Sequence, residues 1–310
     1  MSDTAMGPGR EFDLIRRLVR GWGDRATGIG DDAAVLRVPA GSRLVATTDA
    51  AVDGVHFRRD WCALEEIGYR ATVAAMSDIA AMAALPLGVL VALVLPDDAI
   101  DAVEALARGI GDAAAASEAP IIGGNLARGA ALSMTTTVLG HVDRPLPRSG
   151  ASSGQAIYVT GRFGGPAAAV AAWMAGDQPT AQARERYVHP AARIREARWL
   201  AEHGATAAID ISDGLLADLG HLAHASGVAL EVTLDALPVI AGVPIDRAAR
   251  GGDEYELAIA APDGVDAGAF AETFGIPLTR IATVRDGAPD VRATLAGDRV
   301  APGGGWDHLS

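Results

Sequence analysis

Residues 71–95 read Ala-Thr-Val-Ala-Ala-Met-Ser-Asp-Ile-Ala-Ala-Met-Ala-Ala-Leu-Pro-Leu-Gly-Val-Leu-Val-Ala-Leu-Val-Leu. The run is uncharged from Ile79 to Pro96, close to the roughly 20 residues that a bilayer requires, but a proline and a glycine interrupt it and acidic residues flank it. A membrane span is therefore the weaker interpretation. We predict a buried helix over 71–84 followed by a fully buried strand over 89–95. Such a pattern is typical of a sheet that is covered by helices.

Helical and extended patterns alternate on both sides of this stretch. Apolar residues between Phe12 and Trp22 recur at helical spacing and predict an amphipathic helix, and 43–48 predicts a strand that runs into Asp49. Strand and helix patterns also interleave through the second half of the chain. The fold class that we predict is α+β, in the form of two α/β-type domains with mixed sheets.

The segment Asp143-Arg-Pro-Leu-Pro-Arg-Ser-Gly150 is the best candidate for a linker, because it is rich in proline and polar residues. A chain of 310 residues is long enough for about two domains. We therefore expect one domain over 1–145 and a second over 146–310.

The charge balance excludes several classes of protein. Arg and Lys together number 26 and Asp and Glu 39, for a net charge of −13, and we find no basic face for nucleic acid. Every basic residue is an arginine, so a Walker phosphate loop, the catalytic lysine of protein kinases and a Schiff-base lysine are all excluded. Any phosphate must be bound by arginine, backbone or metal.

Cysteine usage and the N-terminus indicate a cytoplasmic protein. The single Cys62 can form neither an internal disulfide nor a thiolate metal cage, which is typical of a reducing compartment. Residues 1–11 are polar and lack the apolar core of a signal peptide. We expect a protein that binds neither nucleic acid nor membrane.

Four separated segments place Asp where a strand stops or where a helix is otherwise apolar: Gly28-Ile-Gly-Asp-Asp32, Thr47-Thr48-Asp49, Asp78 and Asp210-Ile-Ser212-Asp213-Gly214. Each alone is explained as a turn, a loop acid or a helix N-cap, although a carboxylate at Asp78 is costly without a cation or donors. If these acids converge, each like-charge pair costs roughly 4 kcal/mol at an effective dielectric of 20. Divalent ions would then be needed, and all-oxygen ligands favour Mg²⁺, with Mn²⁺ as an alternative.

Glycines and arginines indicate that the same site also binds a phosphate. Gly123-Gly124 and Gly251-Gly252 would admit a phosphate close to the backbone, and with Mg²⁺ they indicate nucleotide phosphoryl transfer without a Walker loop. His56 follows a strand-end acid and is a candidate for substrate contact, with packing as the alternative. His221 and His224 have a helical ligand spacing but lie on the polar side of their predicted helix, so we do not count them as ligands.

Six motifs in order resemble the thiamine-monophosphate kinase family, and the match covers nearly the whole chain. They are Gly28-Ile-Gly-Asp-Asp32, Thr47-Thr-Asp49, Gly54-Val-His-Phe57, Met76-Ser-Asp-Ile-Ala-Ala-Met82, Asp210-Ile-Ser-Asp-Gly214 and Gly251-Gly-Asp-Glu-Tyr-Glu-Leu257. The resemblance implies the fold shared with aminoimidazole ribonucleotide synthetase, with N-terminal sheets pairing across a homodimer. It also implies direct in-line transfer from ATP to thiamine monophosphate, assisted by several Mg²⁺ ions and without a covalent intermediate.

The resemblance assigns roles position by position. It implies an N-terminal domain that binds ATP and Mg²⁺ and dimerises, and a C-terminal domain that completes the active site. The implied metal ligands are Asp32, Thr47, Thr48, Asp49, Asp78, Asn125, Asp210 and Asp213; the ATP contacts are Gly124, Asn125, Arg148 and Ser212; the substrate contacts are His56, Asp253 and Trp306.

This chain departs from the family pattern at three places. Gly123-Gly-Asn-Leu126 stands where the family has Gly-Gly-Asp-Thr, Asp253-Glu254 reverses the usual Glu-Asp order, and Pro190-Ala-Ala-Arg193 lacks a second proline. An Asn oxygen can bind a cation but carries no charge, so we expect a higher Mg²⁺ requirement. Two alternatives stay open, namely a nucleotide-binding paralogue with little or no turnover and a same-fold ATP-dependent enzyme for another small molecule.

Overall fold

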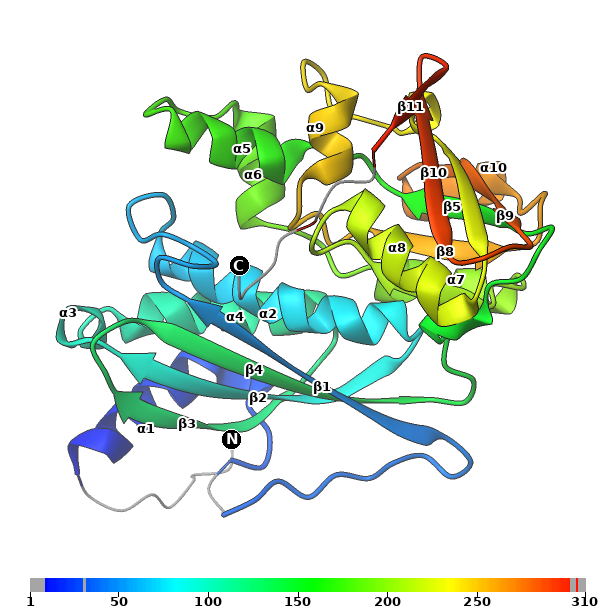
Figure 1. The fold of residues 1–310 in the computed structure, drawn as a ribbon. Helices are drawn as coiled ribbons and strands as arrows, with labels where there is room; N and C mark the ends of the chain where they lie inside the picture. The colour runs from blue at the N-terminus through cyan, green and yellow to red at the C-terminus, as the bar shows by residue number, and fades with distance from the viewer. Residues whose placement is uncertain (1–8, 30–31, 302–304, 306–310) are drawn as a thin grey trace. The chain divides into compact units, whose positions relative to one another are not determined.

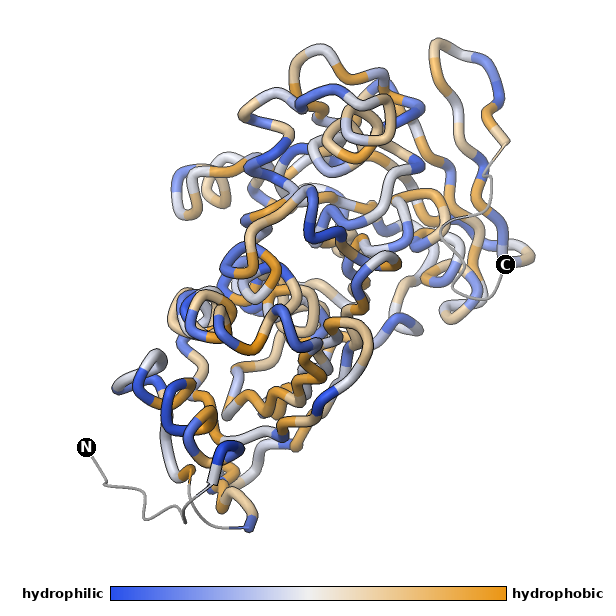
Figure 2. Tube along the Cα trace, turned by 90° about the vertical axis from the view of Figure 1, so that its left-hand side faces the viewer, coloured by the Kyte–Doolittle hydropathy of each residue, from blue (hydrophilic) through white to orange (hydrophobic). Residues whose placement is uncertain are grey.

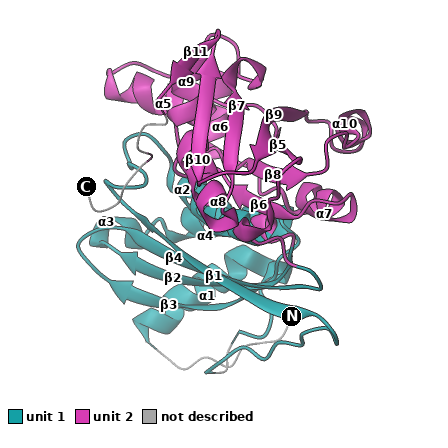
Figure 3. Cartoon of the chain, turned by 45° about the vertical axis from the view of Figure 1, so that its right-hand side comes forward, with its two compact units in different colours: residues 1–79, 84–144 teal, residues 80–83, 145–310 magenta. Residues whose placement is uncertain are grey.

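The computed structural model describes residues 9–29, 32–301 and 305. The chain divides into two compact units (Figure 3): unit 1 comprises residues 1–79 and 84–144, and unit 2 comprises residues 80–83 and 145–310. Each unit combines helices with a mixed sheet, so the predicted fold class is confirmed.

Unit 1 contains a sheet of four strands in the order β1-β4-β2-β3. β2 runs antiparallel to β4 and parallel to β3, and β1 and β3 are the edges. Its elements in chain order are α1 (Arg10–Trp22), a 3₁₀ turn (Gly23–Arg25), β1 (Arg43–Val52), α2 (Leu64–Ala81), β2 (Leu85–Leu95), α3 (Asp97–Ile100), α4 (Val103–Ala116), β3 (Ile121–Arg128) and β4 (Ser133–Val142).

Helices α1, α2 and α4 lie on one face of this sheet (Figure 1). Glycines let α2 and α4 pack backbone to backbone: a Cβ on Gly109 would lie 1.8 Å from the Glu65 carbonyl oxygen, and one on Gly68 would lie 2.4 Å from that of Leu106. The helix face of β2 is closed, because Val89 and Leu93 are at most 2% exposed. This layer therefore forms the core of unit 1.

The other face of the sheet is open and carries both apolar and polar side chains. Val89–Leu95 was predicted to be buried on both sides, yet only alternate residues are, and Leu90, Ala92 and Val94 remain half-buried. Residues paired across neighbouring strands point to the same face, and Leu90 pairs with Thr137 of β4, which pairs with Thr48 of β1. The open face therefore continues across the sheet to β1. On β1 it carries Leu44, which is 54% exposed.

Unit 2 contains a sheet of seven strands in the order β11-β10-β7-β9-β5-β8-β6. Its elements are a 3₁₀ turn (Arg148–Gly150), β5 (Ala156–Thr160), α5 (Gly165–Met174), α6 (Ala181–Val188), α7 (Ile194–Glu202), β6 (Ala207–Asp210), α8 (Leu215–Ser226), β7 (Ala229–Thr233), a 3₁₀ turn (Leu234–Ala236), α9 (Ile245–Arg250), β8 (Leu257–Ala261), α10 (Ala267–Phe274), β9 (Leu278–Arg285), β10 (Asp290–Leu295) and β11 (Asp298–Val300).

Both faces of this sheet are covered. Leu219 and Leu222 of α8 belong to one buried cluster, and Leu200 of α7 and Phe270 of α10 belong to another. A sheet buried on both faces explains why β8 reads as an unbroken apolar run, Leu-Ala-Ile-Ala-Ala. Figure 2 shows that strongly apolar stretches concentrate inside each unit and hydrophilic stretches at its outer loops.

Several elements were not predicted from the sequence. β3 continues from Ile121 through two glycines and Asn125 to Arg128, because pairing with β2 carries it on. The helices α3, α6, α9 and α10 and the strands β9 to β11 were not predicted at all. Among the described residues, no helix has both the length and the apolar character needed to cross a membrane.

Candidate functional site

In unit 1, strand β1 brings a hydroxyl to the acid of the apolar helix. The Thr47 hydroxyl donates a hydrogen bond to Oδ2 of Asp78 on α2. Asp78 is half-buried on a helix whose neighbouring residues are almost all buried. The contact supplies the donor that a carboxylate in such surroundings requires.

The three predicted ligands on β1 do not face the same way. Thr47 and Asp49 share the face of the strand that α2 covers, and Oδ1 of Asp49 accepts from the Ala50 N–H at 2.8 Å. The Thr48 hydroxyl lies on the opposite, open face, 3.0 Å from the hydroxyl of Thr137 on β4. The structure therefore groups Thr47 and Asp49 with Asp78 and separates the Thr48 side chain from them.

Two further predicted residues of unit 1 lie in loops. Asp32 is exposed in the segment before β1. His56 is half-buried in the turn after β1, where its Nδ1 accepts from the Val52 N–H at 3.2 Å. Such a bond makes Nδ1 the acceptor and leaves Nε2 as the protonated ring nitrogen of a neutral imidazole.

Gly124 and Asn125 lie on β3 beside β2, and both are exposed. A Cβ on Gly124 would lie 1.9 Å from the carbonyl oxygen of Val91, so the sheet itself requires glycine there. Asn125 pairs with Ala92. The glycine thus has a packing reason for its presence, independent of any nucleotide.

In unit 2, the loop between β6 and α8 carries the second group of predicted residues. Asp210 ends β6 and is 4% exposed, and Ser212 and Asp213 follow in the half-buried loop. Oδ2 of Asp218, in the first turn of α8, accepts the N–H groups of Ser212, Asp213 and Gly214 at 3.2, 3.2 and 3.1 Å. One carboxylate oxygen therefore holds three consecutive amides of this loop.

The negative charges of this loop oppose one another. Burial, followed by the charges of Asp210 and Asp213, raises the pKa of Asp218 to about 8, although the loop N–H groups act in the opposite direction. A divalent cation would relieve this repulsion, and carboxylate oxygens are ligands that suit Mg²⁺. The donor set of the loop therefore fits the predicted metal.

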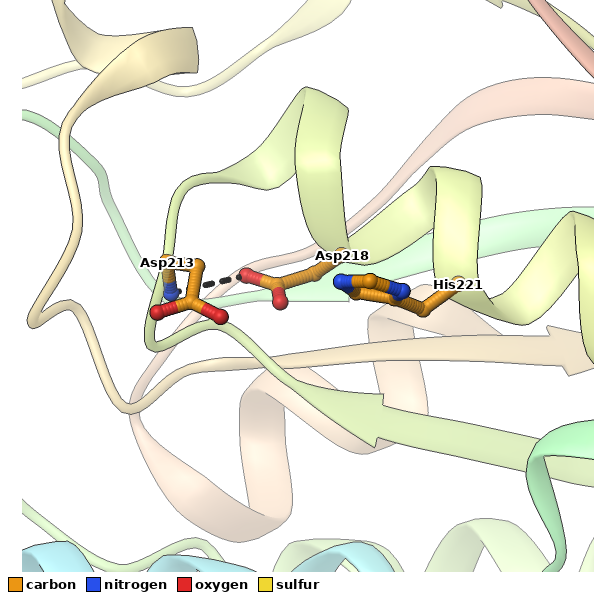
Figure 4. Close-up of side chains that lie close together, drawn as sticks. All are labelled: Asp213, Asp218 and His221. Atoms are coloured by element: carbon orange, nitrogen blue, oxygen red, sulfur yellow. Dashed lines mark hydrogen bonds between the residues drawn. The ribbon is translucent and has the colours of Figure 1, made fainter. Parts of the chain in front are cut away.

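Asp218 was not predicted from the sequence, and His221 was not predicted to be a ligand. One ligand atom from each of Asp213, Asp218 and His221 lies within 4.8 Å of the other two, and Figure 4 shows the Asp218 side chain between its neighbours. The helical spacing of 218 and 221 carried a usable signal, because residues three apart share a helix face. An acid in the first turn after a Ser-Asp-Gly loop was a second signal.

The segment 252–256 runs beside this loop. The Asp253 N–H donates to the Ser212 carbonyl at 2.8 Å, and a Cβ on Gly252 would lie 2.3 Å from the same oxygen. Asp253 and Tyr255 adopt the left-handed region, with φ of 64° and 52°, and the Tyr255 hydroxyl donates to Oδ1 of Asp253 at 3.1 Å. Backbone strain of this kind persists only where the surroundings enforce it.

Buried ion pairs hold the strained backbone of Asp253 and Tyr255 in place. Glu256 accepts from Arg193 at 2.6 and 2.7 Å and from Arg186 at 2.8 Å, and these charges hold its pKa below the usual range although burial alone would raise it. Glu254 accepts from the Gly164 N–H at 2.5 Å, and burial raises its pKa to about 8. The reversed Asp-Glu pair thus places the longer acid inward and Asp253 at the Ser212 loop.

Of the remaining predicted residues, the structure describes Arg148 alone. Arg148 is exposed in the turn at 148–150, and its carbonyl accepts from the Ser226 hydroxyl at 2.7 Å. Trp306 lies outside the described residues. The residue before it, Gly305, lies against Asp213 and Ala217 at the start of α8.

Each of the two units resembles a domain of known proteins. Residues 30–142 match the family model of the AIR synthase related protein N-terminal domain, and residues 152–292 match that of its C-terminal domain. The thiamine-monophosphate kinase of Salmonella typhimurium is 36% identical in an alignment that covers 90% of this chain and 93% of the relative.

Two solved structures show the same likeness. Thiamine-monophosphate kinase from Stenotrophomonas maltophilia is 36% identical with a TM-score of 0.83, covering 94% of this chain and 98% of that one. AaThiL complexed with AMPPCP and TMP is 27% identical with a TM-score of 0.76, covering 98% and 99% of the two chains. The resemblance in the sequence is thereby confirmed, and the chain belongs to the thiamine-monophosphate kinase family, within the AIR synthase related proteins.

Proposed function

We propose that this protein transfers the γ-phosphoryl group of ATP to thiamine monophosphate, forming ADP and thiamine diphosphate. The observation that carries the proposal is likeness over nearly the whole chain to thiamine-monophosphate kinases, among them AaThiL in complex with AMPPCP and TMP. The acidic motifs of both units fit the same reaction. With phosphate as both donor and acceptor, the main obstacle is charge, and no covalent nucleophile is needed.

Mg²⁺ is the cation that we propose for these acids. When bound, it neutralises phosphate charge that would otherwise oppose the reaction. The residues proposed to hold it are Asp32, Thr47, Thr48, Asp49, Asp78, Asn125, Asp210 and Asp213. The Thr47 hydroxyl fixes the Asp78 carboxylate, whereas the side chain of Thr48 lies on the open face of the sheet. Asn125 pairs with Ala92 of the same open face, so Thr48 and Asn125 are the weaker candidates of the set.

The remaining residues bind and orient the two substrates. Gly124, Arg148 and Ser212 are proposed to contact ATP together with Asn125, and the exposed guanidinium of Arg148 suits a phosphate. His56, Asp253 and Trp306 are proposed to contact thiamine monophosphate. An indole can pack on the cationic thiazolium, a contact of roughly 1 to 2 kcal/mol when desolvated.

We further propose a cytoplasmic homodimer whose domains, 1–145 and 146–310, both supply residues to the reaction. The open face of the unit 1 sheet supports the dimer, because its apolar part on β2, Leu90, Ala92 and Val94, is left half-buried in a single chain. Large uncovered apolar faces are typical of interfaces. Pairing of the N-terminal sheets of two chains would cover this face.

The test is ADP formation with and without thiamine monophosphate at several Mg²⁺ concentrations, with thiamine diphosphate identified chromatographically. Thiamine-monophosphate-dependent ADP and an equal amount of thiamine diphosphate support the proposal. Activity only with another acceptor supports a same-fold enzyme of different specificity. ADP formation without thiamine diphosphate means that ATP is hydrolysed to ADP and inorganic phosphate, and it would count against transfer to thiamine monophosphate.

The second candidate is a nucleotide-binding protein with little turnover. It is favoured by Asn125 and Leu126, which replace a carboxylate and a hydroxyl of the family pattern. Tight ATP binding measured by calorimetry, together with no product at high Mg²⁺ concentration, would support it.

A further inference from the structure

The loop that carries Ser212 and Asp213 is tied to an acid to which the proposed function gives no role. Asp218 is 2% exposed, and one of its oxygens accepts three consecutive backbone N–H groups at 3.1 to 3.2 Å. Successive N–H groups that converge on one point form a concave anion site. Here an internal carboxylate occupies that anion site.

This arrangement restrains the loop from one side, and a second contact restrains it from the other. The Ser212 carbonyl accepts from the Asp253 N–H at 2.8 Å. Gly214, with φ of 119°, has no room for a side chain, because a Cβ would lie 2.5 Å from the Arg250 carbonyl oxygen. The main chain of 212–214 is therefore held at its amides, its carbonyl and its glycine.

We propose that Asp218 is the positioning residue of this loop: its carboxylate fixes the amides of 212–214 and so aims the Asp213 carboxylate and the Ser212 hydroxyl. The consequence for catalysis rests on the function proposed above, in which Asp213 holds Mg²⁺ and Ser212 contacts ATP. The consequence for the conformation of the loop does not depend on that function. Groups that orient metal ligands commonly change metal affinity by about 10- to 100-fold when removed.

Two variants separate positioning from direct metal binding. Asp218→Asn keeps an acceptor oxygen of the same size at the same place but cannot ionise, whereas Asp218→Ala removes the acceptor. The matched control is Asp266→Ala, because Asp266 caps α10 by accepting the Ala269 N–H at 2.9 Å and belongs to neither substrate site. It reports what the loss of a local carboxylate–amide bond does elsewhere in unit 2.

The first measurement is amide hydrogen exchange of a peptide spanning 211–214 in the metal-free protein. The second is a pair of Mg²⁺ titrations, which give the Mg²⁺ concentrations for half-maximal thermal stabilisation and for half-maximal activity. The kcat and the KM for ATP are measured alongside. Asp218→Ala should speed loop exchange and raise both Mg²⁺ concentrations by about tenfold or more, and Asp218→Asn should stay within about threefold of the parent. Asp266→Ala should change neither.

Unchanged loop exchange in Asp218→Ala overturns the proposal. So does an Asp218→Asn protein that keeps the protected loop but loses Mg²⁺ binding as fully as Asp218→Ala, since that result identifies a direct ligand. If Asp218→Ala does not fold, Asp218→Asn decides alone: parental loop exchange with parental Mg²⁺ binding supports positioning, and any other result overturns it. Absence of thiamine-monophosphate kinase activity in the parent would refute the function but leave the exchange result intact.

Discussion

At the scale of single residues, Glu254 shows how a buried acid can make stability depend on pH. Its side chain is fully buried, one oxygen accepts from the Gly164 N–H, and the other lies 3.8 Å from Nη2 of Arg186. With its pKa raised to about 8 by burial, the folded protein retains a proton that the unfolded chain releases near pH 4.5. Unfolding in this window therefore releases a proton, and stability falls as pH rises towards 8.

We expect Glu254→Gln to reduce this dependence. Between pH 6 and 8 the parent should lose on the order of 2 kcal/mol of unfolding free energy through this group, and the variant should lose much less. Denaturant unfolding at pH 6, 7 and 8 measures the slopes. Glu202→Gln, an exposed substitution at the end of α7, should keep the parental slope. Equal slopes in the parent and Glu254→Gln would contradict the role given to Glu254.

Asn125 is the residue at which this chain departs most sharply from its family pattern. Asn125→Asp would add a charged oxygen to the proposed metal site, so we expect the Mg²⁺ concentration for half-maximal activity to fall several-fold. A Mg²⁺ titration of initial rates measures it. Ala127→Asp is the matched control, because it adds the same charge two residues further along the exposed part of β3. Identical titrations for Asn125→Asp and the parent would remove Asn125 from the metal site.

At the scale of elements, the alternation of β1 decides which hydroxyl can act with Asp78. Thr47→Val and Thr48→Val are matched changes, since each keeps a β-branched side chain in the strand and removes one hydroxyl. Thr47→Val should raise the Mg²⁺ requirement about tenfold, because Asp78 loses its donor, and Thr48→Val should have the smaller effect. The measurement is again the Mg²⁺ titration. A larger effect of Thr48→Val would place the metal on the open face of the sheet.

At the scale of the whole molecule, the open sheet face of unit 1 predicts association. Leu90 lies on β2, an inner strand of that face, so Leu90→Glu should convert a dimer into a monomer by placing a charge in the interface. Light scattering after size exclusion measures the mass. Met174→Glu, on a helix of unit 2 where the side chain is 69% exposed, should leave the dimer intact. A Leu90→Glu protein that remains dimeric would exclude this face as the interface.

Periodicity and motifs in the sequence were sufficient for much of this description. The stretch 71–95 predicted a helix followed by a strand, because a long apolar run near helix-breaking residues has few other solutions. The structure has both, but α2 begins at Leu64 and ends at Ala81, and β2 begins at Leu85. Six motifs were sufficient for the family. The helix α6 was not predicted. The continuation of β3 through Gly123 and Gly124 was not predicted either, because this part of the strand depends on pairing with β2 rather than on its own residues.

What the sequence by itself determined was residue chemistry: arginine without lysine, acids at strand ends, and a pattern that assigns the chain to one family. Only the tertiary structure decided orientation and partnership. It separated the Thr48 hydroxyl from Asp78 and placed Asp218 under three amides of the Ser212 loop. It also turned Glu254 inward. The physical reason is that charge and periodicity are local properties, whereas burial, facing and hydrogen-bond partners arise only when distant segments pack together.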